Sequence, residues 1–406
     1  MSNPTVVIVG AGLAGATTAV ELRERGFGGR ILLLGAEEHH PYIRPPLSKE
    51  YLKGEADLDD AYVKPADWYA DNDVEFLPGS EAGSFDPAAH ELFLAGGARI
   101  TYDSLVLATG AHARPLGVPG SGHGAVFSLR TIEDSQWLRA ALEVGSRRVV
   151  VVGSGWIGME VAAAARGYGN EVTVAGRSHV PLSPAIGPEL GAVFERLHRD
   201  NGVVFRNAAQ VSAVEGGDEQ VVVLATGERL PADVVVAGVG AAPNTHLAEQ
   251  SGLALDNGVP TDEAMRTAME DVYAVGDLAN PLLPAIGQHL RNEHWANAIA
   301  GGTVAARAIV GEDASYDDIP YFYSDQYDLG MEYSGYAPLA SGARVVFRGD
   351  VAAREFIAFW LRDDRVVAGM NVNVWDVQEH IQRLIRGREA VDPARLTDES
   401  VDLAEL

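Results

Sequence analysis

The chain has 406 residues, 47% hydrophobic and 22% charged, an ordinary composition for a globular protein with room for two or three domains. It contains no cysteine, which excludes a redox-active disulfide, a thiolate nucleophile and a cysteine-held zinc or iron–sulfur site. The net charge of −26 argues against binding nucleic acid or an anionic membrane. Without a long apolar run or a basic leader, the expected location is the cytoplasm.

A strand over residues 5–9, a glycine turn, a helix and a strand over residues 31–34 open the chain. In such a turn the first glycine (Gly10) permits the bend, the second (Gly12) lets the backbone approach a pyrophosphate, and the third (Gly15) lets the helix pack on the strand. Glu37 follows the second strand, where a carboxylate accepts hydrogen bonds from a ribose diol. The unit therefore predicts a dinucleotide site, the alternative being a glycine-rich turn of another α/β protein.

Three prolines hold residues 41–49 extended beside this turn. Arg44 and Lys49 in this segment serve either to position a cofactor or to solvate the surface, and spacing alone favours neither reading. His39 and His40 are a candidate metal pair, but no other ligands cluster near them in the sequence, so no metal site is predicted.

The next predicted elements lead back toward the same ligand. They are a helix at 64–72, a strand at 74–77, a hairpin-like region at 84–102 and an apolar strand at 105–107. This last strand ends in the small residues Ala108, Thr109 and Gly110, as is needed where a backbone passes close to a ligand.

A second strand–turn–helix–strand unit repeats the plan of the first. Its strands are predicted at 149–152 and 171–174, its helix at 159–168, and its turn contains Gly153, Gly155 and Gly158. This internal duplication predicts that one chain binds two dinucleotides.

The second unit ends differently from the first. No acid is available for a ribose diol, and Arg177 stands beside the vacant place, with Ser178 and His179 next to it. A guanidinium there can bind a 2′-phosphate bidentately. The sequence thus favours NADPH over NADH, the alternative being that Arg177 is an exposed loop residue.

The remaining elements complete three domains. They are a helix at 188–201, strands at 203–205, 220–224, 234–236 and 272–275, a helix at 293–310, strands at 345–347, 355–361 and 366–371, and a helix at 377–386. A glycine-rich stretch around Gly240 marks a return crossing, and Asp277 follows a strand on the ligand side of a parallel sheet. The predicted fold class is α/β, with two Rossmann-type domains and a C-terminal α+β domain.

With these residues collected, the whole chain resembles the FAD-dependent ferredoxin reductases of bacterial monooxygenases and ring-hydroxylating dioxygenases, a group of glutathione-reductase-like flavoproteins. The resemblance rests on PYIRPPLSK at 41–49, ATG at 108–110, GSGWIGME at 153–160, YAVGD at 273–277, SDQYD at 324–328 and WDV at 375–377. It implies an FAD domain over 1–112 and 240–315, an NAD(P)H domain over 113–239 and a C-terminal domain over 316–406.

The resemblance also implies which residues bind each cofactor. For FAD they are Gly10, Gly12, Gly15, Glu37, Arg44, Lys49, Ala108, Thr109, Gly110, Arg130, Asp277 and Trp295, and for NAD(P)H they are Gly153, Gly155, Ile157, Gly158, Glu160, Arg177 and Gly240. In the family a lysine and a glutamate matching Lys49 and Glu160 pair near flavin N5, and they are the expected catalytic residues. Many relatives are NADH-dependent and carry an acid where Gly176 stands, so the family does not decide the preference for NADPH.

The implied activity is hydride transfer from NAD(P)H to FAD, followed by single-electron transfer to a [2Fe-2S] ferredoxin that serves a cytochrome P450 or a ring-hydroxylating oxygenase. Reduction of rubredoxin, quinone or oxygen remains an alternative, as does a non-catalytic redox-sensing flavoprotein. The expected chain is a monomer or a dimer. Candidate docking residues for an acidic ferredoxin are Arg291, Arg307 and the helix at 382–388, unless these arginines only solubilise the surface.

Overall fold

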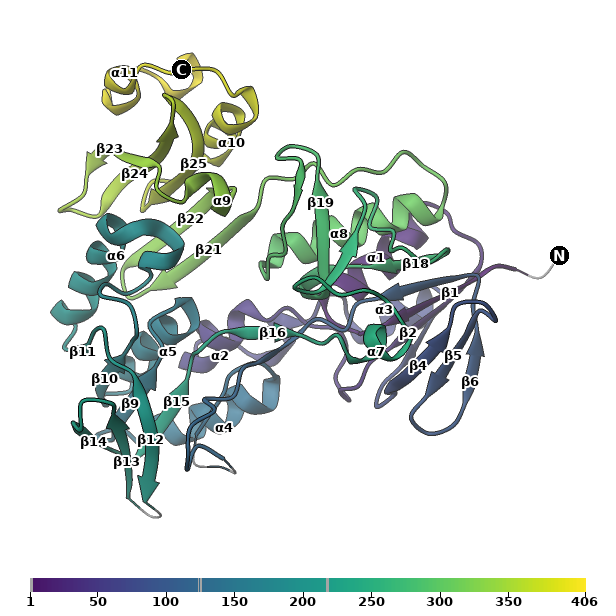
Figure 1. The fold of residues 1–406 in the computed structure, drawn as a ribbon, viewed down its shortest axis with the longest axis horizontal. Helices are drawn as coiled ribbons and strands as arrows, with labels where there is room; N and C mark the ends of the chain where they lie inside the picture. Colours follow the sequence, from purple (N-terminus) through teal and green to yellow (C-terminus); the bar gives the residue numbers. More distant parts are fainter. Residues whose placement is uncertain (1–2, 123, 125, 217–218) are drawn as a thin grey trace. The chain divides into compact units, whose positions relative to one another are not determined.

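The computed structural model describes residues 3–122, 124, 126–216 and 219–406. Contacts within the chain divide it into two units (Figure 1). The first unit comprises residues 1–44, 58–112 and 242–320, and the second comprises 45–57, 113–241 and 321–406. The chain leaves the first unit in β8 (Ala111–Ala113) and returns to it in β16 (Ala241–Pro243).

A five-stranded parallel sheet forms the centre of the first unit. Its strand order is β18 (Val272–Ala274), β7 (Ser104–Leu107), β1 (Thr5–Val9), β2 (Arg30–Leu34) and β3 (Val74–Leu77). The central strands are almost wholly buried, as expected for a parallel sheet covered on both faces. All five carboxyl ends therefore lie along one edge.

Two long helices of this unit pack on each other: α1 (Leu13–Glu24) lies against α8 (Trp295–Ile309) (Figure 1). The hairpin-like region proves to be a three-stranded antiparallel sheet of β4 (Ala82–Asp86), β5 (Glu91–Leu94) and β6 (Arg99–Thr101). The smaller elements are η2 (Leu58–Ala61), α3 (Ala66–Asp71), α7 (His246–Gln250), β17 (Val259–Thr261), η3 (Gly276–Leu278), β19 (Ala279–Leu283) and β20 (Gln288–His289).

The second unit repeats the parallel sheet with four strands. Their order is β11 (Val204–Arg206), β10 (Glu171–Ala175), β9 (Arg148–Val152) and β15 (Val234–Ala237). Beside it lies an antiparallel sheet of β12 (Val211–Gly216), β13 (Gln220–Leu224) and β14 (Arg229–Ala232). The helices of this part are α4 (Ile132–Leu142), α5 (Trp156–Gly167) and α6 (Ser183–Asp200).

The C-terminal part of the second unit is a five-stranded antiparallel sheet. Its order is β21 (Tyr321–Gln326), β22 (Leu329–Gly335), β25 (Arg365–Val372), β24 (Glu355–Arg362) and β23 (Arg344–Asp350). The accompanying helices are α9 (Ala337–Ala340), α10 (Gln378–Gly387), α11 (Pro393–Thr397) and η4 (Leu403–Glu405). On α10, Ile381 packs over Gly369, where an added Cβ would lie 2.5 Å from its Cγ2.

The predicted fold class is confirmed, and one segment groups differently from the predicted domains. The segment 45–57, expected with the FAD domain, groups with the second unit. This segment contains η1 (Pro45–Ser48) and α2 (Glu50–Lys53). It is held there because Ser135 donates a hydrogen bond to the carbonyl of Leu47 (2.8 Å) and Tyr168 donates one to that of Leu52 (2.9 Å).

Some elements were not predicted at all. Strands β21 and β22 and helix α4 are absent from the prediction, although Thr131 and Asp134 form a complete capping box at the start of α4. Helix α6 starts earlier than predicted, but Gly187 interrupts it with a φ of 82°, and its regular part begins at the predicted Pro188.

A buried histidine joins α6 to the C-terminal sheet. The Nε2 atom of His198 lies 2.8 Å from the side-chain carbonyl of Gln326, and the ring packs edge-on against Tyr327 at 5.0 Å between centroids. Burial lowers the pKa of His198 to about 4, with the Gln326 hydrogen bond opposing this shift. The ring is therefore neutral in the folded chain at neutral pH.

We expect this histidine to make stability depend on pH. Since the folded pKa is about 4 and the ordinary value is 6.5, the unfolded chain binds one more proton between these values. Stability is then full above pH 6.5 and falls, by on the order of 3 kcal/mol, as the pH drops toward 4. When urea unfolding is measured between these pH values, the free energy of unfolding of His198→Gln should depend less on pH than that of the unmodified chain. An unchanged pH dependence would contradict the assignment.

Close packing of α8 on α1 gives a second expectation. An added Cβ at Gly302 would lie 2.7 Å from the carbonyl oxygen of Ala14, so Gly302→Ala should lower the free energy of unfolding by about 1–3 kcal/mol despite its higher helix propensity. Gly167 on α5 has no atom within 4 Å of its added Cβ, and Gly167→Ala is the control that should be neutral or slightly stabilising. Equal destabilisation by both would show that packing is not the cause.

Candidate cofactor sites

The turn after β1 admits only glycine at its first and third positions. Gly10 has a φ of +119°, and an added Cβ would lie 2.1 Å from the carbonyl oxygen of Ala108. At Gly15 it would lie 2.0 Å from the carbonyl oxygen of Gly10. At Gly12, by contrast, no described atom lies within 4 Å. The middle position thus has open space in front of it.

The turn after β9 has the same geometry. An added Cβ at Gly153 (φ +113°) would lie 2.1 Å from the carbonyl oxygen of Gly238, and one at Gly158 would lie 2.2 Å from that of Gly153. Gly155 again has no described atom within 4 Å. Because the N-cap residues Gly12 and Gly155 have no side chain, the first amides of α1 and α5 can bind an anion. Both turns fit a dinucleotide pyrophosphate.

Backbone hydrogen bonds align the two strand–turn–helix–strand motifs residue by residue. Gly10 N donates to Leu34 O as Gly153 N donates to Ala175 O, each at 2.8 Å. Further on, Gly79 N donates to Glu37 O and Ala208 N to Ser178 O. Ser178 is therefore the structural counterpart of Glu37, which places Arg177 one residue before it.

At the end of β2 the carboxylate of Glu37 is held in place. Tyr42 Oη donates to its Oε2 at 2.6 Å and Arg44 Nη2 to its Oε1 at 3.2 Å. Burial opposes the charge on Arg44, but the nearby Tyr42, Glu37 and Asp277 outweigh burial and raise its pKa. Arg44 is thus a structural partner of Glu37, and each carboxylate oxygen retains capacity for a further hydrogen bond.

The second unit has no such carboxylate. Arg177 is exposed, and its side chain forms no hydrogen bond or ion pair with the residues that the structure describes. Gly176 is buried, and an added Cβ there would lie 2.3 Å from Ser154 Oγ. An acidic side chain at position 176 would therefore require Ser154 to move.

Other predicted FAD residues lie along the same edge of the first sheet. Thr109 and Asn244 exchange two hydrogen bonds of 2.7 and 2.8 Å, which fix the segment Ala108–Gly110 after β7. Asp277 follows β18 in η3, and its carbonyl accepts a 3.1 Å hydrogen bond from Arg291. Trp295 begins α8 with 37% of its surface exposed.

Lys49 and Glu160 form a buried ion pair within the second unit. Lys49 Nζ lies 3.0 Å from Glu160 Oε1, and the two side chains are 5% and 3% exposed. Ser48 Oγ donates to Oε2 at 2.5 Å and Ser324 Oγ to Oε1 at 2.7 Å. The ammonium group also lies 5.4 Å from the ring centre of Tyr323. The expected pairing of Lys49 with Glu160 is present in the structure.

The remaining predicted NAD(P)H residues surround the second turn. Ile157 lies in the first turn of α5 and is 42% exposed. Gly240 follows β15 with a φ of +102°. Arg130, predicted for FAD, precedes α4, and its backbone amide donates to Asp134 Oδ2 at 2.9 Å.

Sequence reasoning missed four residues of these sites: Ser48, Ser324, Tyr42 and Ser154. All four lie inside stretches already singled out: PYIRPPLSK for Tyr42 and Ser48, GSGWIGME for Ser154 and SDQYD for Ser324. The hydroxyl groups of Tyr42, Ser48 and Ser324, which suit them to hold Glu37 and Glu160, were the available signal.

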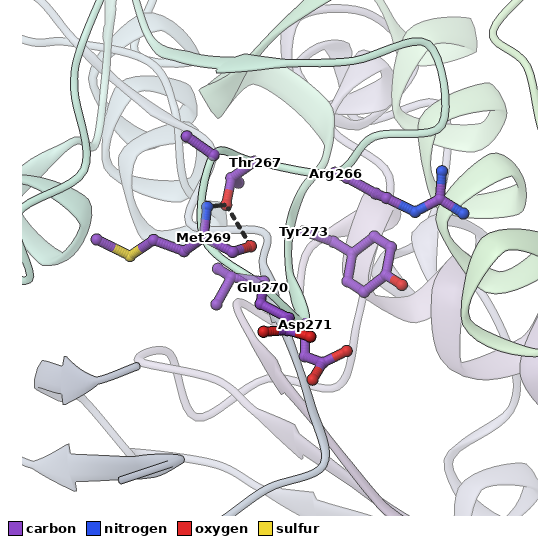
Figure 2. A pocket seen from close by; sticks show the side chains of 8 residues that line it. Arg266, Thr267, Met269, Glu270, Asp271 and Tyr273 are labelled. Carbon is purple, nitrogen blue, oxygen red and sulfur yellow. Dashed lines mark hydrogen bonds between the residues drawn. The ribbon is translucent and has the colours of Figure 1, made fainter. Parts of the chain in front are cut away.

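A surface pocket lies away from these sites. It is lined by residues 266–273, and Figure 2 shows Arg266 and Tyr273 on one side of it. Because it adjoins the amino end of β18, it lies at the edge of the sheet opposite the glycine turn. We therefore exclude this pocket from the dinucleotide sites.

Several charged residues considered earlier have partners in the chain. Arg291 is 10% exposed and pairs with Glu293 at 2.8 Å, while Arg307 lies 3.8 Å from Glu312. Arg383 donates to the carbonyls of Leu403 and Leu406. Of the docking candidates, Arg386 and Arg388 in the second unit are exposed, and Arg386 donates a 3.3 Å hydrogen bond to Gln382 Oε1 within α10.

The part of the chain that the structure describes holds no candidate metal cluster and no membrane-spanning helix. No group of three or more histidine or acidic side chains in that part of the chain is arranged to hold a metal ion. Every helix found there is too short or too polar to cross a bilayer.

Family comparisons cover nearly the whole chain. The profile described as pyridine nucleotide-disulphide oxidoreductase matches residues 4–302, and that described as reductase C-terminal matches residues 321–406. Putidaredoxin reductase of Pseudomonas putida is 37% identical over 100% of this chain and 97% of its own. The ferredoxin–NAD(+) reductase component of the anthranilate 1,2-dioxygenase system of Burkholderia cepacia is 38% identical over 99% of each chain.

Solved structures agree with these relatives. The covalent putidaredoxin reductase–putidaredoxin complex matches with a TM-score of 0.94 at 37% identity, covering 100% of this chain and 98% of that one. The ferredoxin reductase for the CYP199A2 system of Rhodopseudomonas palustris matches with a TM-score of 0.95 at 35% identity, covering 99% of each chain. The predicted resemblance is confirmed.

The open space at Gly12 gives a direct test of the first site. Gly12→Ala adds a methyl group that meets no protein atom, so the apoprotein should unfold as the unmodified apoprotein does while its FAD content falls at least roughly tenfold through the lost pyrophosphate contact. Flavin absorbance per chain and urea unfolding measure the two effects. Gly96→Ala, also with no atom within 4 Å but remote from the turn, should retain the flavin.

Proposed function

The chain belongs to the pyridine nucleotide-disulphide oxidoreductase family, and on that premise we propose that it is an FAD-dependent NAD(P)H:ferredoxin reductase. The observation that carries this proposal is the pair of equivalent glycine turns, each open only at its middle glycine. Two of the relatives described above are named as ferredoxin–NAD(+) or putidaredoxin reductases, and the absence of cysteine excludes the disulfide chemistry of other family members.

The residues that follow β2 and β10 indicate which cofactor each glycine turn would bind. Glu37, fixed by Tyr42 and Arg44, suits the ribose diol of the FAD adenosine. The segment Ala108–Gly110 and Asp277 lie along the same edge and would hold the rest of FAD. The second turn, with Ile157 and Gly240 beside it, would hold NAD(P)H.

The chain's own contribution to the reaction is orientation and charge. Bound FAD would accept a hydride from NAD(P)H and release the two electrons singly to a [2Fe-2S] ferredoxin. Lys49 supplies a buried positive charge. Glu160 Oε1 lies 3.0 Å from Lys49 Nζ and fixes the position of this ammonium group. A positioned ammonium group of this kind would steady the negative charge that develops on reduction.

NADPH is the proposed preferred donor. Arg177 is exposed and available, and neither Gly176 nor Ser178 offers a carboxylate to a ribose diol. A guanidinium beside a 2′-phosphate forms a bidentate charge-assisted contact that NADH lacks. The same exposure allows Arg386 and Arg388 to meet an acidic ferredoxin, which has to approach a chain of net charge −26.

Ferredoxin reduction tests the proposed activity. NAD(P)H should bleach the flavin within the time of one turnover, and cytochrome c should be reduced only when a [2Fe-2S] ferredoxin is present. Fast cytochrome c, quinone or oxygen reduction without ferredoxin would overturn the assignment of the acceptor. Slow bleaching with a long-lived charge-transfer band would favour the redox-sensing alternative.

Side-by-side kinetics test the choice of donor. NADPH should exceed NADH in kcat/KM, and Arg177→Glu should shift the ratio toward NADH by about tenfold or more, or about 1.4 kcal/mol. Arg196→Glu is the matched control, because Arg196 is 83% exposed on α6 and makes only a long ion pair of 3.9 Å with Asp200. A tenfold advantage for NADH in the unmodified chain would refute the role of Arg177.

A further inference from the structure

A chain of buried polar side chains connects Glu160 with His198. Ser324 Oγ lies 2.7 Å from Glu160 Oε1, Gln326 Nε2 lies 3.1 Å from Ser324 Oγ, and His198 Nε2 lies 2.8 Å from Gln326 Oε1. These four side chains are at most 3% exposed. The chain runs from α5 across β21 to α6, entirely within the second unit.

The direction of each hydrogen bond follows from the first. A carboxylate only accepts, so the single hydroxyl proton of Ser324 points to Glu160. Ser324 then has only a lone pair for Gln326, which must present its amide NH₂ group to Ser324 and its carbonyl to His198. Consequently, the Nε2 atom of His198 carries the proton.

The far end of the chain agrees with this assignment. His198 Nδ1 is buried and has no hydrogen-bond partner, as suits an unprotonated nitrogen. Burial among Phe205 and Tyr327 lowers the pKa of His198 to about 4, so the ring stays neutral. A proton on Nδ1 would be buried without an acceptor.

The near end explains why the direction matters. Ser324 and Lys49 share Oε1 of Glu160, and Ser48 occupies Oε2. Rotation of the carboxylate would therefore break several contacts at once. Every link turns its donor toward Glu160, which adds aligned dipoles to the hydrogen bonds.

We propose that Ser324, Gln326 and His198 are positioning residues for the Lys49–Glu160 pair, and that they act by fixing the direction of the hydrogen bonds to Glu160. This inference rests on the proposed function for the role of the Lys49–Glu160 pair. The series of hydrogen bonds from Glu160 to His198 does not depend on that function. None of the three residues transfers a proton or an electron. Through β21, the C-terminal domain thereby controls the orientation of a buried ammonium group in the second unit.

The first test is nitrogen NMR of the full chain labelled with ¹⁵N-histidine. His198 should be in the Nε2–H tautomer at neutral pH, with a slowly exchanging proton, and its signal is identified by its loss in His198→Gln. This measurement needs neither NAD(P)H nor ferredoxin, so it can succeed or fail separately from the proposed function. An Nδ1–H tautomer or an imidazolium at neutral pH would overturn the proposal.

The second test uses the pH profile of flavin bleaching by NAD(P)H. In Gln326→Glu, an ionised carboxylate cannot donate to Ser324, whereas a protonated one can donate to Ser324 and still accept from His198. The titratable groups that face these four side chains are Lys49, Tyr323, Asp325 and Tyr327. Bleaching should be roughly tenfold slower than in the unmodified chain at neutral pH and should recover as the pH falls.

Two further variants separate positioning from folding. Gln326→Met, which has similar size but no hydrogen-bonding amide, should be slow at every pH. Asn371→Leu removes another fully buried amide of the C-terminal sheet, one that does not contact the chain to Glu160, and should lower stability without changing the pH profile. If the Gln326→Glu profile runs parallel to that of the unmodified chain, the residues do not position the pair.

Discussion

At one edge of each parallel sheet, two backbone segments approach so closely that no side chain fits between them. Gly10 meets the carbonyl of Ala108, and Gly153 meets that of Gly238, in both cases with an added Cβ at 2.1 Å. This contact aims the first amides of α1 and α5 at the open space beside the middle glycine. The positions of Glu37, Asp277 and Arg177 at these edges follow, because parallel strands bring their carboxyl ends together.

A second constraint is the buried ion pair between Lys49 and Glu160, which the proposed reaction uses. Removing an ammonium and a carboxylate from water is costly, and their mutual attraction compensates only when further hydrogen bonds satisfy both groups. Glu160 meets that requirement with Lys49, Ser48 and Ser324, which come from two stretches of the sequence that are both distant from Glu160 itself. The buried pair thus explains why residues 45–57 group with the second unit and why β21 belongs to the site.

The sequence predicted the parts of the fold that depend on local pattern. Apolar strands followed by spaced glycines identified both dinucleotide units. The sequence alone also distinguished the two units, because Glu37 follows the second strand of the first and Arg177 follows that of the second. Contacts between distant residues could not be predicted in this way, since Ser48 and Ser324 lie 112 and 164 residues from Glu160. The equivalence of Ser178 with Glu37 also needed backbone hydrogen bonds, because the two turns that follow the strands differ in sequence.

We infer that one chain uses two nucleotide sites to divide an electron pair between two acceptor molecules. Anaerobic titration of the purified flavoprotein with NADPH in the presence of excess oxidised [2Fe-2S] ferredoxin measures this directly. Two ferredoxins should be reduced for each NADPH consumed. Consumption of NADPH with no reduced ferredoxin, or a chain that retains no flavin, would contradict the claim.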